Sequence, residues 1–226
     1  MDLVDAVAPS LVGVLRRDLW WMSWNTVLAW IPVGLAFVVF RWAGRKDRRL
    51  SPAWWGGAVL LLLFLPNSPY VVTDLVHLRD TVRAVGDGPV VSTVLPVYVA
   101  FIASGFLAYY LVLAELGRFL EQRGWGRWRT PVTLAVHLLC AVGVFLGRWV
   151  RLNSWEPVVE PVGTLERMVL ALTWEWAPIL IAAVFAATAL GHFVTRAVVE
   201  TGAVSVRRGV RQVRALRLGP PSADQA

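Results

Sequence analysis

In "PAWWGGAVLLLLFLPNSPYVVTDLVHL", residues 52–78, an apolar run is followed by two prolines, an aspartate and a histidine. The 14 residues of Pro52–Leu65 make about 21 Å of helix at 1.5 Å per residue, less than the roughly 30 Å hydrocarbon core of a bilayer. Pro66 removes a backbone donor and disfavours helical geometry at the residue before it. Ser68 and Pro69 suit the cap and first position of a new helix. We therefore predict a membrane-spanning helix that is broken between Pro66 and Pro69.

Composition extends this interpretation to the whole chain. Of its 226 residues 57% are hydrophobic and only 16% are charged, whereas soluble domains carry about 25% charged residues. The 13 tryptophans are typical of membrane–water interfaces. The sequence predicts an all-α integral membrane helical bundle with about five transmembrane helices. The predicted spans are Trp24–Phe40, Pro52–Leu65, Val90–Leu113, Pro131–Val150 and Glu166–Val194.

The orientation is predicted from the basic residues, because cytoplasmic loops carry an excess of Lys and Arg. With the N-terminus outside and the C-terminus inside, 15 of the 22 basic residues fall in inner segments. These inner residues are Arg41, Arg45, Lys46, Arg48, Arg49, Arg118, Arg123, Arg127, Arg129, Arg196, Arg207, Arg208, Arg211, Arg214 and Arg217. We expect a multi-pass protein of the plasma membrane.

Three segments are predicted. Residues 1–22 form an outer or interfacial segment, residues 23–200 a single transmembrane domain, and residues 201–226 a basic, partly disordered cytoplasmic tail. The excess positive charge of the tail favours anionic lipid of the inner leaflet as its partner, rather than nucleic acid. The sequence leaves the cofactor and the protein partners undetermined.

Polar residues gather at the predicted outer face. Tyr70, Asp74 and His77 are spaced i, i+4 and i+7, so they share one stripe of a helix. The segment "GRWVRLNSWEPVVEP", residues 147–161, reaches the same face at the end of the fourth span. Asp74 and His77 are the candidate catalytic residues. The candidate ligand-binding residues are Arg148, Arg151, Asn153, Glu156, Asn67, Asn25 and Glu175, the last predicted to lie inside the fifth span, where an ionisable residue is a functional candidate.

Three stretches of the chain carry a family resemblance. "WNTVLAWIP" (24–32), "LPNSPYVVTDLVHL" (65–78) and "GRWVRLNSWE" (147–156) resemble the signatures of a bacterial membrane family, domain of unknown function 1361. The likeness covers roughly residues 20–195, and Ser68 and Glu156 stand where that family usually has alanine and aspartate. It implies a small multispanning protein, with no known reaction. It also marks signature positions at Asn25, Asn67, Asp74, His77, Arg148, Arg151, Asn153 and Glu156.

Four interpretations of the polar cluster stay open. Asp74 and Arg148 or Arg151 suit a structural ion pair that ties the outer segments together, as in an assembly factor. Asp74, His77 and Glu156 supply the ligand types of a divalent metal site, although nearby arginines oppose a cation. The two arginines form a fork for a phosphate-bearing envelope or lipid ligand, with His77 as acid or base and Asp74 orienting its imidazole. Translocation of an ion or solute is the fourth.

Overall fold

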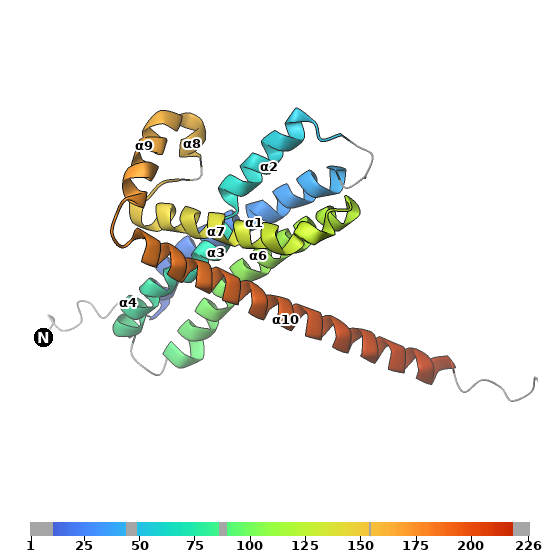
Figure 1. Ribbon diagram of the computed structural model, residues 1–226. Coiled ribbons are helices and arrows are strands. Elements are labelled where there is room, and N and C mark those ends of the chain that lie inside the picture. Colours follow the sequence, from blue (N-terminus) through green and yellow to red (C-terminus); the bar gives the residue numbers. More distant parts are fainter. Residues whose placement is uncertain (1–10, 44–48, 86–89, 154, 219–226) are drawn as a thin grey trace, which may run out of the picture.

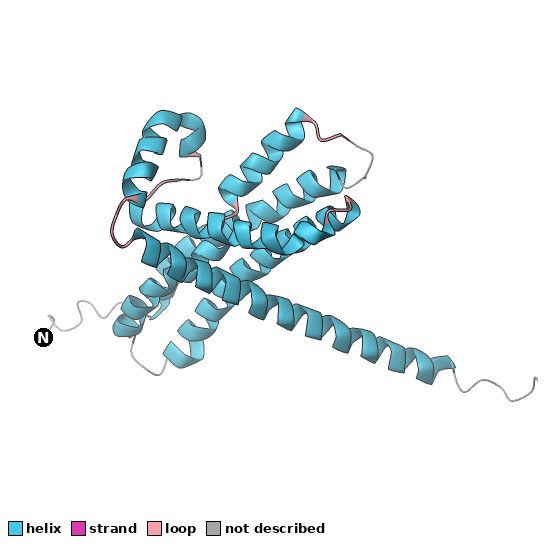
Figure 2. Cartoon of the chain, viewed as in Figure 1, coloured by secondary structure: helices cyan, strands magenta, loops and turns pink. Residues whose placement is uncertain are grey.

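The computed structural model describes residues 11–43, 49–85, 90–153 and 155–218, and every regular element in these ranges is helical (Figure 2). Five helical stretches are long and apolar enough to cross a membrane, which confirms the predicted helical bundle. The protein is therefore a multi-pass membrane protein. The five stretches are Asp18–Arg41, Pro52–Arg83, Ser92–Gln122, Gly126–Val150 and Ala177–Val206.

The long helices alternate in direction across the bundle (Figure 1). The C-terminal ends of α1 (Leu11–Ala43), α6 (Leu95–Gln122) and α10 (Ala177–Leu218) lie toward one side, and the start of α1 lies toward the other. Because α1 and α10 run through residues 22–23 and 200–201 without interruption, the predicted segment boundaries there do not coincide with ends of helices. The inside–outside orientation stays a prediction.

The second span is broken, but less sharply than expected. α2 (Pro52–Phe64) is followed by α3 (Asn67–Tyr70), a 3₁₀ turn η1 (Val71–Asp74) and α4 (Leu75–Val85). The prediction that the residue before Pro66 leaves helical geometry is wrong, since Leu65 has φ −57° and ψ −36°. Instead, the spacing of the backbone hydrogen bonds decreases locally from four residues to three. The amide of Ser68 donates to the carbonyl of Leu65 over 3.1 Å.

Ser68 is not a helix cap, which corrects a second detail of the prediction. It lies inside α3, and its hydroxyl donates to the carbonyl oxygen of Ala29 in α1 over 2.7 Å. On its other sides the break packs against glycines. A Cβ on Gly143 of α7 (Arg129–Phe145) would stand 2.5 Å from Cγ of Pro66, and one on Gly105 of α6 would stand 2.6 Å from the carbonyl oxygen of Ser68. The break is therefore clamped between three helices.

The fifth span starts later than predicted. Residues from Glu166 onward were expected in it, but α9 (Pro161–Leu172) is a separate helix that ends in a turn over residues 173–176. α10 then begins at Ala177, with Pro178 in its first turn, where proline is tolerated because amides there have no helical partner. Before α9 the chain passes through a π-helical turn η4 (Leu146–Val150) and the short α8 (Glu156–Val159).

Four hydrophobic clusters lie among the described helices. The largest joins α1, α2, α6 and α7 around Val39, Leu65 and Val112, and another joins the N-terminal half of α1 to α6 around Met22 and Tyr98. Polar groups inside the bundle are paired across helices. Nδ1 of His137 lies 2.8 Å from the buried hydroxyl of Tyr109, and the ring of His192 lies 5.2 Å from that of His137. These contacts are those expected of interhelical histidines.

Candidate functional site

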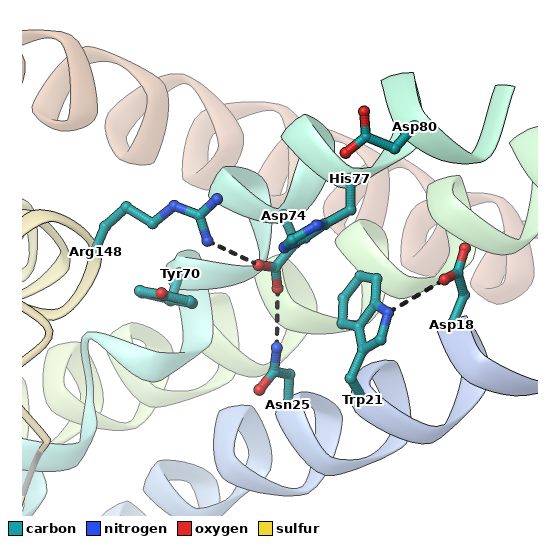
Figure 3. A pocket seen from close by; sticks show the side chains of 8 residues that line it. All are labelled: Asp18, Trp21, Asn25, Tyr70, Asp74, His77, Asp80 and Arg148. Carbon is teal, nitrogen blue, oxygen red and sulfur yellow. Dashed lines mark hydrogen bonds and ion pairs between the residues drawn. The ribbon is translucent and has the colours of Figure 1, made fainter. Parts of the chain in front are cut away.

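A cavity of about 550 Å³ opens among α1, the broken second span and η4 (Figure 3). Its volume lies within the range of about 300 to 1,000 Å³ that is typical of small-molecule sites. Ionisable and aromatic side chains dominate its wall, and we call this cavity the polar pocket. Its lining residues are Asp18, Trp21, Asn25, Tyr70, Asp74, His77, Asp80 and Arg148.

Asp74 is the centre of the polar pocket. Its side chain is 3% exposed, and its two carboxylate oxygens have different partners. Nδ2 of Asn25 donates to Oδ2 over 3.0 Å, and Nη1 of Arg148 lies 3.6 Å from Oδ1. Asp74 therefore connects α1, the break and η4. The predicted stripe is present as well, because Tyr70 and His77 line the same pocket.

His77 is exposed on α4 and has no bond to Asp74 in the described structure, so the expected orienting contact is missing. Its ring packs on the indole of Trp21, with centroids 5.2 Å apart. An aromatic neighbour limits the rotation of the imidazole but does not fix its tautomer. The imidazole therefore lies at the open side of the pocket, packed against Trp21.

The two arginines separate, which the sequence analysis did not anticipate. Arg148 lies in η4 and lines the pocket, with its side chain 26% exposed. Arg151 follows with φ 60°, a left-handed conformation that turns the chain away, and it is exposed and lines neither of the cavities described here. Among the residues that the structure describes, the guanidinium of Arg148 pairs only with Asp74, over 3.6 Å, which is longer than a hydrogen bond. Its N–H groups are therefore available to an acceptor.

The N-terminal part of α1 contributes side chains to the polar pocket that were not among the predicted site residues, with the exception of Asn25. Asp18, Trp21 and Asn25 are spaced i, i+3 and i+7, so they project from one face of that helix into the pocket, a signal that the sequence already contains. Asp18 is buried, and its carboxylate accepts a hydrogen bond from the hydroxyl of Thr81 over 2.6 Å. Asp80 was missed because it lies beyond the predicted stripe.

An apolar groove of about 520 Å³ adjoins the polar pocket. The groove lies between α2 and α7 and is also bounded by the segment that follows η4. Its wall consists mainly of Leu, Val, Phe and Trp side chains. Asn25 and Tyr70 line both the polar pocket and this groove. The polar pocket and the apolar groove therefore share one wall. Two further predicted site residues, Asn67 and Asn153, line the groove.

Glu156 and Glu175 lie outside both cavities. Oε1 of Glu156 accepts bonds from the backbone amide and the side chain of Asn153, at 3.0 and 2.7 Å, and Oε2 pairs with Arg167 at 2.8 Å. The backbone N–H of Asn153 is the main reason that the pKa of Glu156 is lowered. Glu175 lies exposed in the turn before α10, not inside a span as predicted.

The predicted metal set is not assembled. Because Glu156 is engaged by Asn153 and Arg167, it does not join Asp74 and His77 in the polar pocket. Within the ranges that the structure describes, no group of three or more His, Cys, Asp or Glu side chains is placed to hold a metal ion.

Residues 24–190 match the family described as protein of unknown function (DUF1361). The chain belongs to the DUF1361 family. The matched region contains the whole apolar groove and, with the exception of Asp18 and Trp21, the whole polar pocket. This DUF1361 protein matches no curated protein and no solved structure. Its function is therefore argued from the site alone.

Proposed function

We propose that this DUF1361 protein binds an amphiphilic, phosphate-bearing molecule of the cell envelope at the outer face of the plasma membrane. The headgroup occupies the polar pocket, and an acyl or similar apolar chain occupies the adjoining groove. One observation carries the proposal: the two cavities share Asn25 and Tyr70, so a single ligand reaches a charged site and an apolar channel together.

Arg148 is the group proposed to hold the phosphate. Arginine presents several N–H donors in a planar fork that suits phosphate oxygens. In this structure the guanidinium of Arg148 lines the pocket and makes a 3.6 Å contact with Asp74. A phosphate can therefore accept hydrogen bonds from the guanidinium N–H groups without breaking a short ion pair. His77 is the pocket group suited to proton transfer if the bound molecule is processed. Asp74 and Asn25, which are hydrogen-bonded to each other, form the adjacent wall of the pocket.

The groove explains why the ligand is amphiphilic. Val59, Leu62 and Leu63 line one side, and Leu139 and Val142 line the other. Apolar surface removed from water contributes about 25 cal/mol per Å², but a lipid chain entering from a bilayer gains little from this term. The groove therefore selects for shape and position, while the polar pocket supplies most of the affinity.

Binding is tested by thermal melting of the detergent-solubilised full chain with dioleoyl phosphatidylglycerol, and with dioleoylglycerol as the matched lipid without phosphate. We expect the phospholipid alone to raise the melting temperature. Arg148→Gln should weaken the apparent affinity by about tenfold or more, because hydrogen bonds to charged groups contribute roughly 1.5 to 3 kcal/mol. Arg151→Gln, which removes the same charge three residues away, should leave it unchanged. Equal stabilisation by both lipids would contradict the proposal.

A structural lock is the second candidate function, and the burial of Asp74 at the junction of three segments favours it. Breaking a buried ion pair leaves an uncompensated charge and destabilises by up to about 3 to 5 kcal/mol. If the lock is the whole function, Asp74→Asn and Arg148→Gln lower the melting temperature to a similar extent, and no lipid raises that of the wild type. A lipid response in the wild type excludes this candidate.

The basic tail is proposed to bind anionic lipid of the inner leaflet. α10 has 42 residues, about 63 Å at 1.5 Å per residue, so its C-terminal part extends beyond a hydrocarbon core of roughly 30 Å. Five arginines lie between residues 207 and 217, and each contributes about 1 kcal/mol near an anionic surface. A peptide of residues 201–218 should bind phosphatidylglycerol vesicles at low salt and leave phosphatidylcholine vesicles unbound. Equal binding to both would refute it.

A further inference from the structure

Charge is separated across the polar pocket (Figure 3). Arg148 lies at one side, Asp18 and Asp80 lie at the opposite side, and the rings of Trp21 and His77 stand between them. Three of the eight side chains that line the pocket are aspartates and one is an arginine. A headgroup that carries only negative charge therefore finds a favourable contact at Arg148 and none at the aspartates.

The carboxylates differ in whether they are already bonded. Asp18 accepts from the hydroxyl of Thr81 and from Nε1 of Trp21, at 2.6 and 3.4 Å. Asp74 is held by Asn25 and Arg148. Asp80 forms no ion pair and no hydrogen bond with any residue that the structure describes, including Arg83 one turn further along α4.

We propose that the ligand is zwitterionic and carries a primary or quaternary amine in addition to its phosphate. The phosphate contacts Arg148, and the ammonium group contacts the carboxylate of Asp80 at the opposite side of the pocket. The assignment rests on the proposed function and names the class of headgroup that the same site takes. Its basis is the position of the two charges, because a cationic group of the ligand meets a carboxylate that is not paired with any residue in the described part of the chain.

Two physical arguments support the ammonium position. A cation and a carboxylate in contact at a protein surface attract each other, and salt screens the attraction because Asp80 is exposed. An aminophospholipid headgroup also offers the aspartates of the pocket a positive partner, which a purely anionic headgroup lacks.

The test compares headgroups on identical dioleoyl chains, with the full protein in detergent and affinity measured from the melting shift. Phosphatidylethanolamine should bind wild type at least about tenfold more tightly than phosphatidylglycerol does, the ratio expected for one hydrogen bond to a charged group. Asp80→Asn should remove this preference and leave binding of phosphatidylglycerol unchanged or tighter. Glu166→Gln, an exposed carboxylate on α9 outside the pocket, is the matched control and should keep the preference.

A competition experiment needs no variant: glycerophosphoethanolamine should displace the bound phospholipid from wild type at a lower concentration than glycerophosphoglycerol. Equal affinity for the two lipids, unchanged by Asp80→Asn, would overturn the zwitterion assignment and leave the phosphate site standing. If no phospholipid shifts the melting of wild type, the proposed function fails and the assignment fails with it.

Discussion

Asp74 and the two arginines show how single residues decide the site. Arg148 and Arg151 are three apart, and in a continuing α-helix they would lie on one side and form the predicted fork. The chain instead makes a π-helical turn over Leu146–Val150 and then takes a left-handed conformation at Arg151. π-helical turns are frequent at functional sites, and this one directs a single arginine toward Asp74.

Glu156 gives a prediction at the same scale. The amide of Asn153 donates to its carboxylate, which lowers the pKa of Glu156 below the ordinary value of 4.5. A group whose pKa is lower in the folded state stabilises the fold above its unfolded-state pKa, and this contribution disappears as the pH falls through the folded-state pKa. We expect the amide of Asn153 to lose protection from hydrogen exchange as the pH falls through that range.

The protection of the Asn153 amide is measured by hydrogen–deuterium exchange of residues 151–156 as a function of pH, after correction for the intrinsic exchange rate. Glu156→Gln should abolish the pH dependence, because the amide oxygen of glutamine accepts the same bond without titrating. A transition of equal size in Glu156→Gln would show that another group is responsible.

At the scale of elements, the broken second span positions the site. Leu65 and Pro66 keep helical backbone angles, and the break is a tight turn in which the amide of Ser68 bonds to the carbonyl three residues before it. The 3₁₀ turn that follows has about three residues per turn, which changes the direction of the side chains after Tyr70 and sets Asp74 against α1. Close contact with α6 at Gly105 keeps the turn in place.

Gly105 therefore provides a test of this close contact. A Cβ there would overlap the side chain of Val71 and stand 2.6 Å from the carbonyl oxygen of Ser68, which cannot move without disturbing the break. We expect Gly105→Ala to lower the free energy of unfolding by about 1 to 3 kcal/mol, as overpacking does. Thermal or denaturant unfolding in detergent measures it.

The control is Gly34→Ala in α1, where nothing lies within 4 Å of the added methyl group. This change should be neutral or stabilise by up to about 1 kcal/mol, because alanine is the better helix former. Equal effects of the two substitutions would mean that the break does not need the close approach of α6.

At the scale of the whole molecule, the ends of the helices sort onto two sides. The lining of the polar pocket includes Asp18, Trp21 and Asn25 from the N-terminal part of α1. The C-terminal ends of α1, α6 and α10 lie toward the other side of the bundle (Figure 1). Of the basic residues predicted to be cytoplasmic and described by the structure, Arg41 lies in the last turn of α1 and Arg118 near the C-terminal end of α6. The distribution of basic residues and the arrangement of the helices thus agree on which helix ends lie on the same side of the bundle. Which of the two sides is cytoplasmic is predicted from the basic residues alone.

Cysteine labelling tests the orientation. In intact cells, a membrane-impermeant maleimide should label Val159→Cys, which is exposed on α8, and should label Arg127→Cys only after permeabilisation. Wild type is the unlabelled control, because its Cys140 is buried. Labelling of Arg127→Cys from outside would reverse the predicted topology and place the polar pocket at the inner face.

The sequence by itself determined the fold class, the number of spans and the position of the break. These depend on local quantities, namely runs of apolar residues matched to bilayer thickness and prolines that interrupt backbone bonding. The stripe of Tyr70, Asp74 and His77 was predictable for the same reason, since helical spacing decides it. Only the tertiary structure decided which side chains converge. Asp18 and Asp80 join the pocket, while Arg151, Glu156 and Glu175 leave it, because helix packing and the turns after α7 lie outside the reach of local spacing.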